Sequence, residues 1–320
     1  MTVAPAPACR PTLAGHLELL RVDHWVKNVF VLPGMVVAWS LDPARFAPAA
    51  IPRLAGALLS VGLVASSNYV LNGLLDAPHD RCHPLKRHRA APAGRIDTRL
   101  AWVQWLALMA AGVALGLWVS RPFALTMAAL WGMGCVYNVS PLRTKDVPYL
   151  DVVSEAVNNP LRMLAGWYAT GTAAVPITSL LLSYWMAGCY FMAVKRLAEL
   201  RTFGSTALGT AYRRSFAYYT EARLLNSIAF YGSVAMLFFG AFIMRYRLEL
   251  ILAFPAVAWV MAAYLAMAFR EGSAAQNPER LYRERGLMAA VSITTVLMLA
   301  LLYVDVPALY LFFPPTVPLR

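Results

Sequence analysis

The sequence predicts an all-α bundle of about nine transmembrane helices, and three features carry this prediction. Of 320 residues, 60% are hydrophobic and only 14% are charged, against about 25% charged residues in soluble domains. Nine apolar runs approach the roughly 17–25 residues that cross a bilayer, and no long polar segment separates them. Lysine and arginine gather on alternate loops. We therefore expect a single transmembrane domain at 28–320, preceded by a tail and a short amphipathic approach helix at 1–27.

The predicted spans have bounds that are loose by a few residues. The first is short and contains Pro33, and the first 27 residues hold no apolar core of the kind that a signal peptide has. The spans are 28–41, 54–75, 100–119, 122–139, 149–170, 175–197, 223–244, 249–269 and 287–304.

The distribution of positive charge predicts the orientation. Of the 28 Lys and Arg residues, 21 lie in the amino-terminal segment or after even-numbered spans, and 6 lie on the other side. Cytoplasmic loops carry such an excess, so we expect the amino terminus and the polar motifs below in the cytoplasm. The net charge of +12 then reflects topology and phosphate or lipid ligands, and we expect no nucleic acid partner. The four cysteines are scattered without a CxxC spacing, which indicates neither a disulfide framework nor a zinc ribbon.

The first polar motif lies at the end of the second predicted span. Asn68, Asn72, Asp76 and Asp80 are each four residues apart, so a helix places them on one face. Carboxylate and amide oxygens suit Mg²⁺, which usually shares its ligands with substrate phosphates. Pro78 removes one helix hydrogen bond, so we expect a break of the helix between Asp76 and Asp80 that leaves Asp80 on the loop, still facing the metal. Cations that suit phosphate oxygens follow directly: Arg81, Lys86, Arg87 and Arg89.

The alternative for this motif is a polar helix cap beside a loop whose charge sets topology. It is weaker because Asn68 and Asn72 lie deeper in the span than a cap requires. His79, Cys82 and His83 invite a zinc site, but no fourth ligand has a fitting spacing.

The second polar motif starts at the boundary of the fifth predicted span. Asp151 and Glu155 are four residues apart, and Arg162 continues their face together with Asn158 and Asn159. An arginine this deep needs a partner, either Glu155 or a phosphate. A buried structural pair of Glu155 and Arg162 is the alternative, and it leaves Asp151 unexplained. Arg143 and Lys145 precede the motif on the approach loop.

A third motif, KRLAELR at 195–201, ends the sixth predicted span. Lys195 and Glu199 have the spacing of a common surface pair worth about 0.3–0.5 kcal/mol. Alone this indicates nothing further, but beside the other motifs Lys195 becomes a candidate phosphate contact.

These motifs resemble the UbiA superfamily of intramembrane prenyltransferases. Its first motif reads NDxxDxxxD, and NGLLDAPHD matches it at Asn72, Asp76 and Asp80, with Gly73 in place of the first Asp. Its second motif reads DxxxD in many members, and DVVSE matches it at Asp151 and Glu155. The resemblance covers nearly the whole chain.

Within that superfamily, three stretches resemble the decaprenyl-phosphate phosphoribosyltransferase branch: WVKN at 25–28, DRCHPLKRHR at 80–89 and KRLAEL at 195–200. The runs at 140–162 and 89–94 depart from that branch. The resemblance implies a Mg²⁺-dependent transferase that binds a diphosphate donor and a polyprenyl lipid. In both chemistries of the superfamily, metal and cations neutralise a diphosphate leaving group, which leaves an electron-poor carbon.

The resemblance also implies roles for individual residues. Asp76, Asp80 and Asp151 are expected to be catalytic and, with Asn72 and Glu155, to bind Mg²⁺. The expected substrate contacts are Lys27, Asn72, Lys86, Arg87, Arg143, Lys145, Glu155, Arg162 and Lys195.

Two other functions stay open. The enzymatic alternative is aromatic prenyl transfer of the 4-hydroxybenzoate type. A membrane transporter is the rival from another class, although the charged motifs gather at one face rather than midway. We expect an integral protein of a bacterial inner membrane, and the sequence is compatible with a homo-oligomer.

Overall fold

The computed structural model of the chain describes most of its length, and the statements below concern that part. The described residues are 10–45, 47–81, 86–172, 174–203, 214–270, 272–276 and 278–313.

Helices make up the secondary structure of the described residues, which contain no strand. The α-helices are α1 (Leu13–Leu19), α2 (Leu32–Leu41), α3 (Ile51–Asp80), α4 (Thr98–Val119), α5 (Arg121–Asn138), α6 (Leu150–Ala156), α7 (Asn158–Ala169), α8 (Thr178–Phe203), α10 (Glu221–Tyr246), α11 (Phe254–Met267), α12 (Arg285–Tyr303) and α13 (Leu309–Phe312). Short 3₁₀ helices are η1 (Val22–Val31), η2 (Pro43–Arg45), η3 (Pro48–Ala50), η4 (Lys86–His88), η5 (Thr144–Asp146), η6 (Arg214–Ala217), η7 (Leu248–Ala253), η8 (Ala274–Gln276) and η9 (Pro278–Arg283). The all-α prediction is thus confirmed.

The chain divides into two compact units, and each is described by itself. The first contains residues 1–176 and 205–219, and the second contains residues 177–204 and 220–320. The single domain expected at 28–320 stays a prediction.

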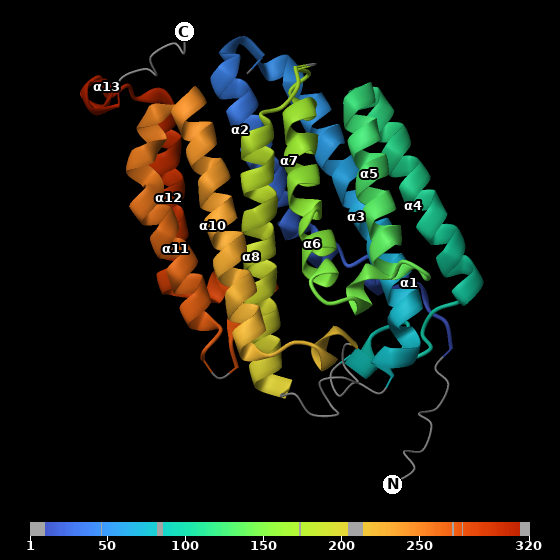
Figure 1. Ribbon diagram of the computed structural model, residues 1–320. Helices are drawn as coiled ribbons and strands as arrows, with labels where there is room; N and C mark the ends of the chain where they lie inside the picture. Colours follow the sequence, from blue (N-terminus) through green and yellow to red (C-terminus); the bar gives the residue numbers. More distant parts are fainter. Residues whose placement is uncertain are drawn as a thin grey trace. The chain divides into compact units, whose positions relative to one another are not determined.

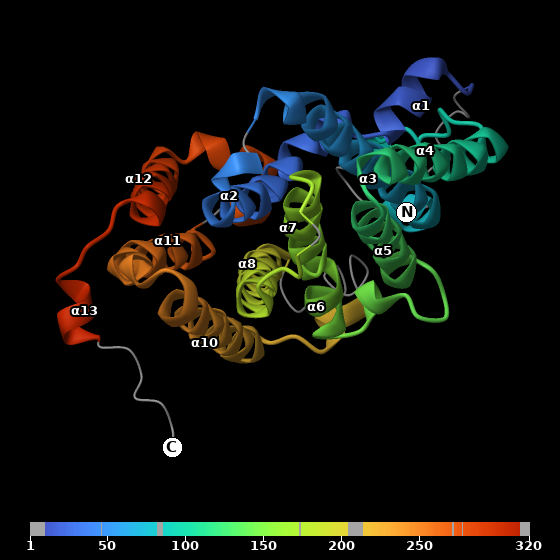
Figure 2. The same ribbon diagram turned by 90° about the horizontal axis from the view of Figure 1, so that it is seen from above.

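In the first unit, α3, α4 and α5 lie side by side, with α7 and α2 packed in turn against them (Figures 1 and 2). Two glycines allow α2 and α7 to touch. A Cβ at Gly34 would lie 1.9 Å from the Met163 carbonyl oxygen, and one at Gly166 would lie 1.9 Å from that of Val31. Any larger residue at either position would push the helices apart.

Aliphatic side chains fill the core between these helices. Its buried members are Val31, Met35, Ala57, Val61, Val64, Val119, Phe123, Met127, Leu130, Ala165 and Ala169. Burying one such Val, Leu or Phe side chain contributes about 1.5–3 kcal/mol. This core holds α3 and α7 in place. The first polar motif lies on α3, and Arg162 of the second motif lies on α7.

Local capping explains where three helices of this unit begin. The Thr12 hydroxyl accepts a hydrogen bond from Gly15 N (3.0 Å) at the start of α1. The Asp97 carboxylate accepts one from Leu100 N (2.9 Å) at the start of α4, and this bond lowers the pKa of Asp97. The Ser120 hydroxyl caps α5 in the same way. Side-chain oxygens at these positions satisfy amide groups that the helix leaves unpaired.

In the second unit, α8 and α10 lie side by side, and α11 packs against α12 (Figures 1 and 2). Two buried hydroxyls fasten α8 to its neighbours. Ser183 donates to the Ala235 carbonyl of α10 at 2.9 Å, and Tyr190 donates to the Met261 carbonyl of α11 at 2.7 Å.

Five helical segments of the described chain are long and apolar enough to cross a membrane. They are Ile51–Pro78, Thr98–Val119, Glu221–Tyr246, Leu248–Met267 and Arg285–Tyr303. The other predicted spans coincide with shorter or less apolar helices, so the number nine stays a prediction. The run at 28–41 is divided between η1 and α2, which restarts with Pro33 in its first turn, where proline is tolerated. The run at 149–170 is divided at Val157.

Candidate active site

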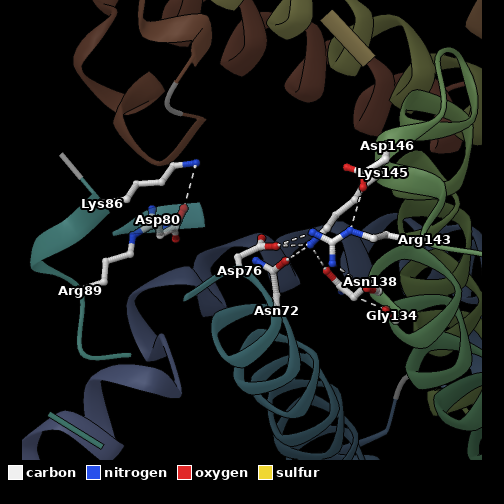
Figure 3. Close-up of polar contacts among 10 residues, drawn as sticks. All are labelled: Asn72, Asp76, Asp80, Lys86, Arg89, Gly134, Asn138, Arg143, Lys145 and Asp146. Atoms are coloured by element: carbon white, nitrogen blue, oxygen red, sulfur yellow. Dashed lines mark hydrogen bonds and ion pairs between the residues drawn. The ribbon is translucent and has the colours of Figure 1, made fainter. Parts of the chain in front are cut away.

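The first polar motif lies on one face at the carboxyl end of α3. Asn72, Asp76 and Asp80 follow one another at helical spacing, and Figure 3 shows them beside two groups of cations. Pro78 lies inside the last turn of α3 without ending it, and the helix reaches Asp80. The expectation that Pro78 breaks the helix between Asp76 and Asp80 and leaves Asp80 on the loop is therefore wrong.

Lys145 and Arg143, from the loop that follows α5, bind Asp76. Lys145 Nζ donates to Asp76 Oδ1 at 2.5 Å and to Asn72 Oδ1 at 3.3 Å. Arg143 Nη2 donates to the same Asp76 oxygen at 3.3 Å. The Lys145 side chain is only 7% exposed, whereas that of Asp76 is 24% exposed. A buried ammonium therefore lies directly behind a carboxylate that solvent still reaches.

Asn138, the last residue of α5, orients both cations. Its side-chain Oδ1 accepts from Lys145 Nζ at 2.9 Å, and its carbonyl accepts from Arg143 Nη1 at 3.2 Å. Its Nδ2 donates to the Gly134 carbonyl at 2.9 Å, which fixes the amide. Asp146 Oδ2 accepts from Arg143 Nε at 2.8 Å. The sequence did not single out Asn138 among the site residues, although it directly precedes the basic loop.

Asp80 has a separate pair of cations from the loop that follows α3. Arg89 Nη1 lies 3.4 Å from Asp80 Oδ2, and Lys86 Nζ lies 3.9 Å from Asp80 Oδ1. Both distances are long for charge-assisted hydrogen bonds, which measure about 2.7–2.9 Å. Arg87 is exposed, and its Nε donates to His88 at 3.2 Å. The structure thus brings Lys86 to the carboxylates and directs Arg87 to a neighbour on its own loop.

Asp151 of the second motif is completely buried and is bound by hydroxyl groups. Tyr219 Oη donates to Asp151 Oδ1 at 2.5 Å, and Ser215 Oγ donates to Asp151 Oδ2 at 3.3 Å. The Tyr219 oxygen also accepts from Tyr149 N at 2.7 Å. Sequence reasoning missed Tyr219 and Ser215, because nothing in the spacing connects them with Asp151.

Glu155 and Arg162 of the second motif lie on two different helices, α6 and α7. Arg162 is 8% exposed, and its Nε has no hydrogen-bond partner among the described residues. No ion pair joins Glu155 to Arg162 in that part of the chain, so the alternative of a structural pair is wrong. An arginine in this state is suited to an anionic ligand.

Two further predicted contacts lie elsewhere. Lys27 is half-buried in η1. Lys195 belongs to the second unit, where it lies 4.0 Å from Glu199. Glu199 is not the surface partner that its spacing predicts, because it is buried and accepts from the buried Arg196 at 2.7 Å.

A cavity of about 220 Å³ opens beside α3 in the first unit. Its lining comes from α1, η1, α3 and the loop after α3: Glu18, Leu19, Arg21, Asp23, Tyr69, Asn72, Gly73, Asp80, Arg89, Ala90, Ala91 and Pro92. Gly73 has a structural reason here, because a Cβ at this position would lie 2.8 Å from Leu19 Cδ1. The residue that replaces the expected Asp makes room for α1.

Backbone strain is concentrated at the same place. The described non-glycine residues with positive φ are Arg21 (49°), Arg143 (28°) and Tyr149 (65°). Arg21 lines the cavity, Arg143 binds Asp76, and Tyr149 N binds Tyr219. Each such conformation costs on the order of 1–3 kcal/mol and clusters at binding or catalytic sites.

The described residues contain no group of three or more His, Cys, Asp or Glu side chains placed to hold a metal by themselves. Mg²⁺ does not need such a group, because it is usually held by one or two carboxylates together with substrate phosphates. Asp76 and Asp80, one helical turn apart beside the Asn72 amide, are oxygen donors of the kind that it takes. The residues present therefore fit Mg²⁺ with a phosphate ligand. Of the rejected zinc candidates, Cys82 and His83 lie outside the described residues.

Comparison with known proteins agrees with this arrangement. A profile of the UbiA prenyltransferase family matches residues 28–288. Decaprenyl-phosphate phosphoribosyltransferase of Mycobacterium tuberculosis is 32% identical over 214 residues, which are 66% of this chain and 68% of that protein. The uncharacterized protein y4nM of Sinorhizobium fredii is 30% identical over 160 residues, which are 50% of this chain and only 30% of that protein. The match thus spans under a third of the length of y4nM.

Solved structures show the same fold. The structure of a UbiA homolog from Archaeoglobus fulgidus bound to DMAPP and Mg²⁺ superposes with a TM-score of 0.68 at 20% identity, and covers 91% of this chain and 99% of that one. A second structure of that homolog, bound to GPP and Mg²⁺, has the same TM-score at 21% identity.

Proposed function

The chain belongs to the UbiA prenyltransferase family, and from this premise we propose that it transfers a phosphoribosyl group from phosphoribosyl diphosphate to a polyprenyl phosphate with Mg²⁺. It is a transferase and an integral membrane protein. The donor, the acceptor and the metal belong to the proposal. The similarity to decaprenyl-phosphate phosphoribosyltransferases supports them, and so do the basic groups beside both α3 carboxylates.

The single observation that carries the proposal is the pairing at the end of α3. Asp76 contacts Lys145 and Arg143, and Asp80 contacts Lys86 and Arg89. A diphosphate that binds here can take these cations as partners in place of the two carboxylates. Asp76 and Asp80 are then free to bind the metal. When bound, Mg²⁺ would be held by Asp76, Asp80 and Asn72 and would neutralise charge on the diphosphate.

The proposed reaction exchanges one C–O bond for another. The bond between ribose C1 and the diphosphate breaks, and the diphosphate leaves with the bonding electrons. An oxygen of the polyprenyl phosphate then bonds to C1. Because that oxygen is already ionised, no base has to remove a proton from it. Lys145 and Arg143 stabilise the charge that develops on the leaving oxygens, and each positioned donor of this kind is worth roughly 10²–10³ in rate.

Asp151, Glu155 and Arg162 complete the proposed site from α6 and α7. In this proposal Arg162 binds donor phosphate, while Asp151 and Glu155 are the second acidic motif. Lys27 and Lys195 stay candidate phosphate contacts. We place the site on the cytoplasmic side of a bacterial inner membrane, because lysine and arginine gather there.

Aromatic prenyl transfer is the second candidate function. Two structures of the A. fulgidus homolog are bound to Mg²⁺ with DMAPP or with GPP, and a prenyl diphosphate is the donor that this alternative requires. A site that neutralises a diphosphate serves either donor, and the enzyme's choice between them separates the two functions.

A turnover assay on purified protein in detergent tests the proposal. With Mg²⁺, one reaction receives phosphoribosyl diphosphate and a polyprenyl phosphate, and the other receives a prenyl diphosphate and 4-hydroxybenzoate. We expect a ribosylated lipid, detected by mass spectrometry, in the first reaction only. A prenylated aromatic in the second reaction alone would contradict the proposal. Metal-dependent turnover without a sealed membrane would also exclude transport as the primary activity.

A further inference from the structure

The cavity beside α3 contains an arginine that the proposed reaction does not yet use. Arg21 lines the cavity from the residue that precedes η1. Its backbone has a φ of 49°, a conformation that costs a non-glycine residue free energy. A residue held in this way is over-determined by its surroundings, and those surroundings fix where its guanidinium lies.

Two neighbours hold the Arg21 guanidinium in place. Its Nη2 contacts His24 Nε2 at 2.5 Å, and its Cζ lies 5.5 Å from the centroid of the Tyr69 ring. Tyr69 also lines the cavity. The arginine is therefore positioned at the cavity wall by a histidine of η1 and an aromatic ring of α3.

The wall opposite α3 is fastened by α1. Glu18 Oε1 accepts from Ala90 N at 2.9 Å, and Glu18 Oε2 accepts from Arg95 Nη2 at 2.6 Å. Thr12 N donates to the Arg95 carbonyl at 3.0 Å. Leu19 occupies the space that a side chain at position 73 would fill. Hydrogen bonds thus fasten α1, which lines one side of the cavity, to the loop that lines another.

Asn72 connects this cavity with the carboxylate cluster. It lines the cavity, and its Oδ1 accepts from Lys145, which also binds Asp76. Asn72 is therefore common to two sets of cations: it binds Lys145, which shares Asp76 with Arg143, and it lines the cavity together with Arg21 and Arg89. A prenyl diphosphate has one charged group, the diphosphate, and could contact only one of these sets of cations. A donor that contacts both sets must have two separate phosphate groups joined by a short polar linker.

The size of the cavity agrees with a small polar group. Its volume of about 220 Å³ is below the range of roughly 300–1,000 Å³ typical of sites for drug-sized ligands. A phosphate monoester carries a charge of about −1.5 to −2 and forms charge-assisted hydrogen bonds with arginine.

We propose that this cavity is a phosphate monoester subsite in which Arg21 is the principal cation. The inference rests on the proposed function, where the monoester comes from the 5-phosphate of the donor or from the phosphate of the polyprenyl acceptor. Arg89 is the second cation of the subsite. It contacts Asp80 in this structure and, in the proposal, contacts the phosphate instead when the ligand binds.

Calorimetric binding in detergent with Mg²⁺ tests the subsite without turnover. The probes are inorganic diphosphate, phosphoribosyl diphosphate and a short-chain polyprenyl phosphate. We expect Arg21→Gln to weaken one of the two monoester-bearing probes at least 10-fold, and to change the Kd of diphosphate less than 2-fold. A selective loss for phosphoribosyl diphosphate assigns the subsite to the donor, and a selective loss for polyprenyl phosphate assigns it to the acceptor.

Two variants make the result decisive. Arg99→Gln removes an exposed arginine of the first turn of α4 and should leave all three Kd values unchanged. Arg21→Gly relieves the positive φ, so it should fold at least as well as wild type and still lose binding. Equal loss for all probes, or no loss in either Arg21 variant, would overturn the subsite. A selective binding loss in a protein that makes no ribosylated lipid would overturn only the proposed reaction.

Discussion

Asp76 and Asp151, the central carboxylates of the two polar motifs, are held in opposite ways. Asp76 is partly exposed and contacts two cations. Asp151 is inaccessible to solvent and accepts hydrogen bonds from two hydroxyl groups. Cations that bind a carboxylate can move to a phosphate when one arrives. Hydroxyl groups that satisfy a buried carboxylate leave a costly unpaired charge if they move away.

This difference teaches that similar acidic spacing does not imply a similar role. Asp76 is ready to exchange its partners for metal and diphosphate. Asp151 is buried and has a hydroxyl donor on each of its carboxylate oxygens. The predictions below use this contrast, and each replaces one partner at a time.

The largest effect is expected for Asp76→Asn. Loss of a metal-binding carboxylate removes several kcal/mol of transition-state stabilisation, so kcat/KM should fall about 10³-fold with the fold retained. Steady-state kinetics with Mg²⁺ in detergent measure this loss. Asp42→Asn is the control, because Asp42 is a partly exposed carboxylate paired with one cation, Arg45 at 2.6 Å, and has no place in the proposed site. Activity of Asp76→Asn within 10-fold of wild type would remove Asp76 from the site.

A smaller loss is expected for Lys145→Met, and none for Arg87→Met. Lys145 contacts Asp76, Asn72 and Asn138, so its loss should lower kcat/KM about 10²-fold. Arg87 is exposed and donates to His88, so its loss should change kcat/KM less than about 3-fold. Measuring kcat/KM for both variants over the same range of donor concentration shows whether the position of a cation or only its charge determines activity. Equal losses would mean that the basic loops act only through their net charge.

Tyr219→Phe should affect stability more than rate. The variant leaves Asp151 with one hydroxyl partner and Tyr149 N without its acceptor, which costs about 1–3 kcal/mol for each buried polar group left unsatisfied. We expect a lower Tm in detergent and a kcat/KM near that of wild type below the transition. An Mg²⁺ requirement that shifts in this variant would instead identify Asp151 as a metal ligand in turnover.

The smallest effect is expected at Asp97, a third kind of carboxylate, which is exposed and held by a backbone amide. The Leu100 N–H lowers the pKa of Asp97 below its usual value. The stabilisation is therefore complete above that usual value, near 4, and is lost as pH falls through the lower folded pKa. Asp97→Asn should lower Tm slightly at neutral pH, and the difference from wild type should shrink below about pH 4. A difference that is independent of pH would contradict this role.

Local periodicity was sufficient to predict the α3 part of the site. Asn72, Asp76 and Asp80 repeat with the helical period, and that spacing alone places them on one face. The approach of cations from both basic loops to the α3 carboxylates agrees with the charge pattern, because Lys86 and Arg89 contact Asp80 while Arg143 and Lys145 contact Asp76. The local environment of each cation was not predictable, since Lys86 and Arg87 are adjacent in sequence and only Lys86 approaches Asp80.

Packing between distant segments was beyond the sequence. Tyr219 and Ser215 reach Asp151 across 68 and 64 positions of the chain, and no periodic pattern records such a contact. Gly73 is a second example. In the sequence it stands where the motif has an Asp, whereas in the structure its lack of a side chain leaves room for Leu19 of α1. The interruption of the fifth predicted span at Val157, by contrast, has a local signal, because Pro160 in the first turn of α7 has no N–H to continue the helix from α6.

The central claim is that the end of α3 and the donor's phosphates hold Mg²⁺ together. The most direct measurement is the Kd of phosphoribosyl diphosphate, by calorimetry in detergent, with Mg²⁺ and with EDTA. The account predicts that Mg²⁺ tightens binding at least 10-fold in the wild type and that Asp76→Asn abolishes this gain. The same Kd in EDTA and in Mg²⁺ for the wild type would contradict the claim.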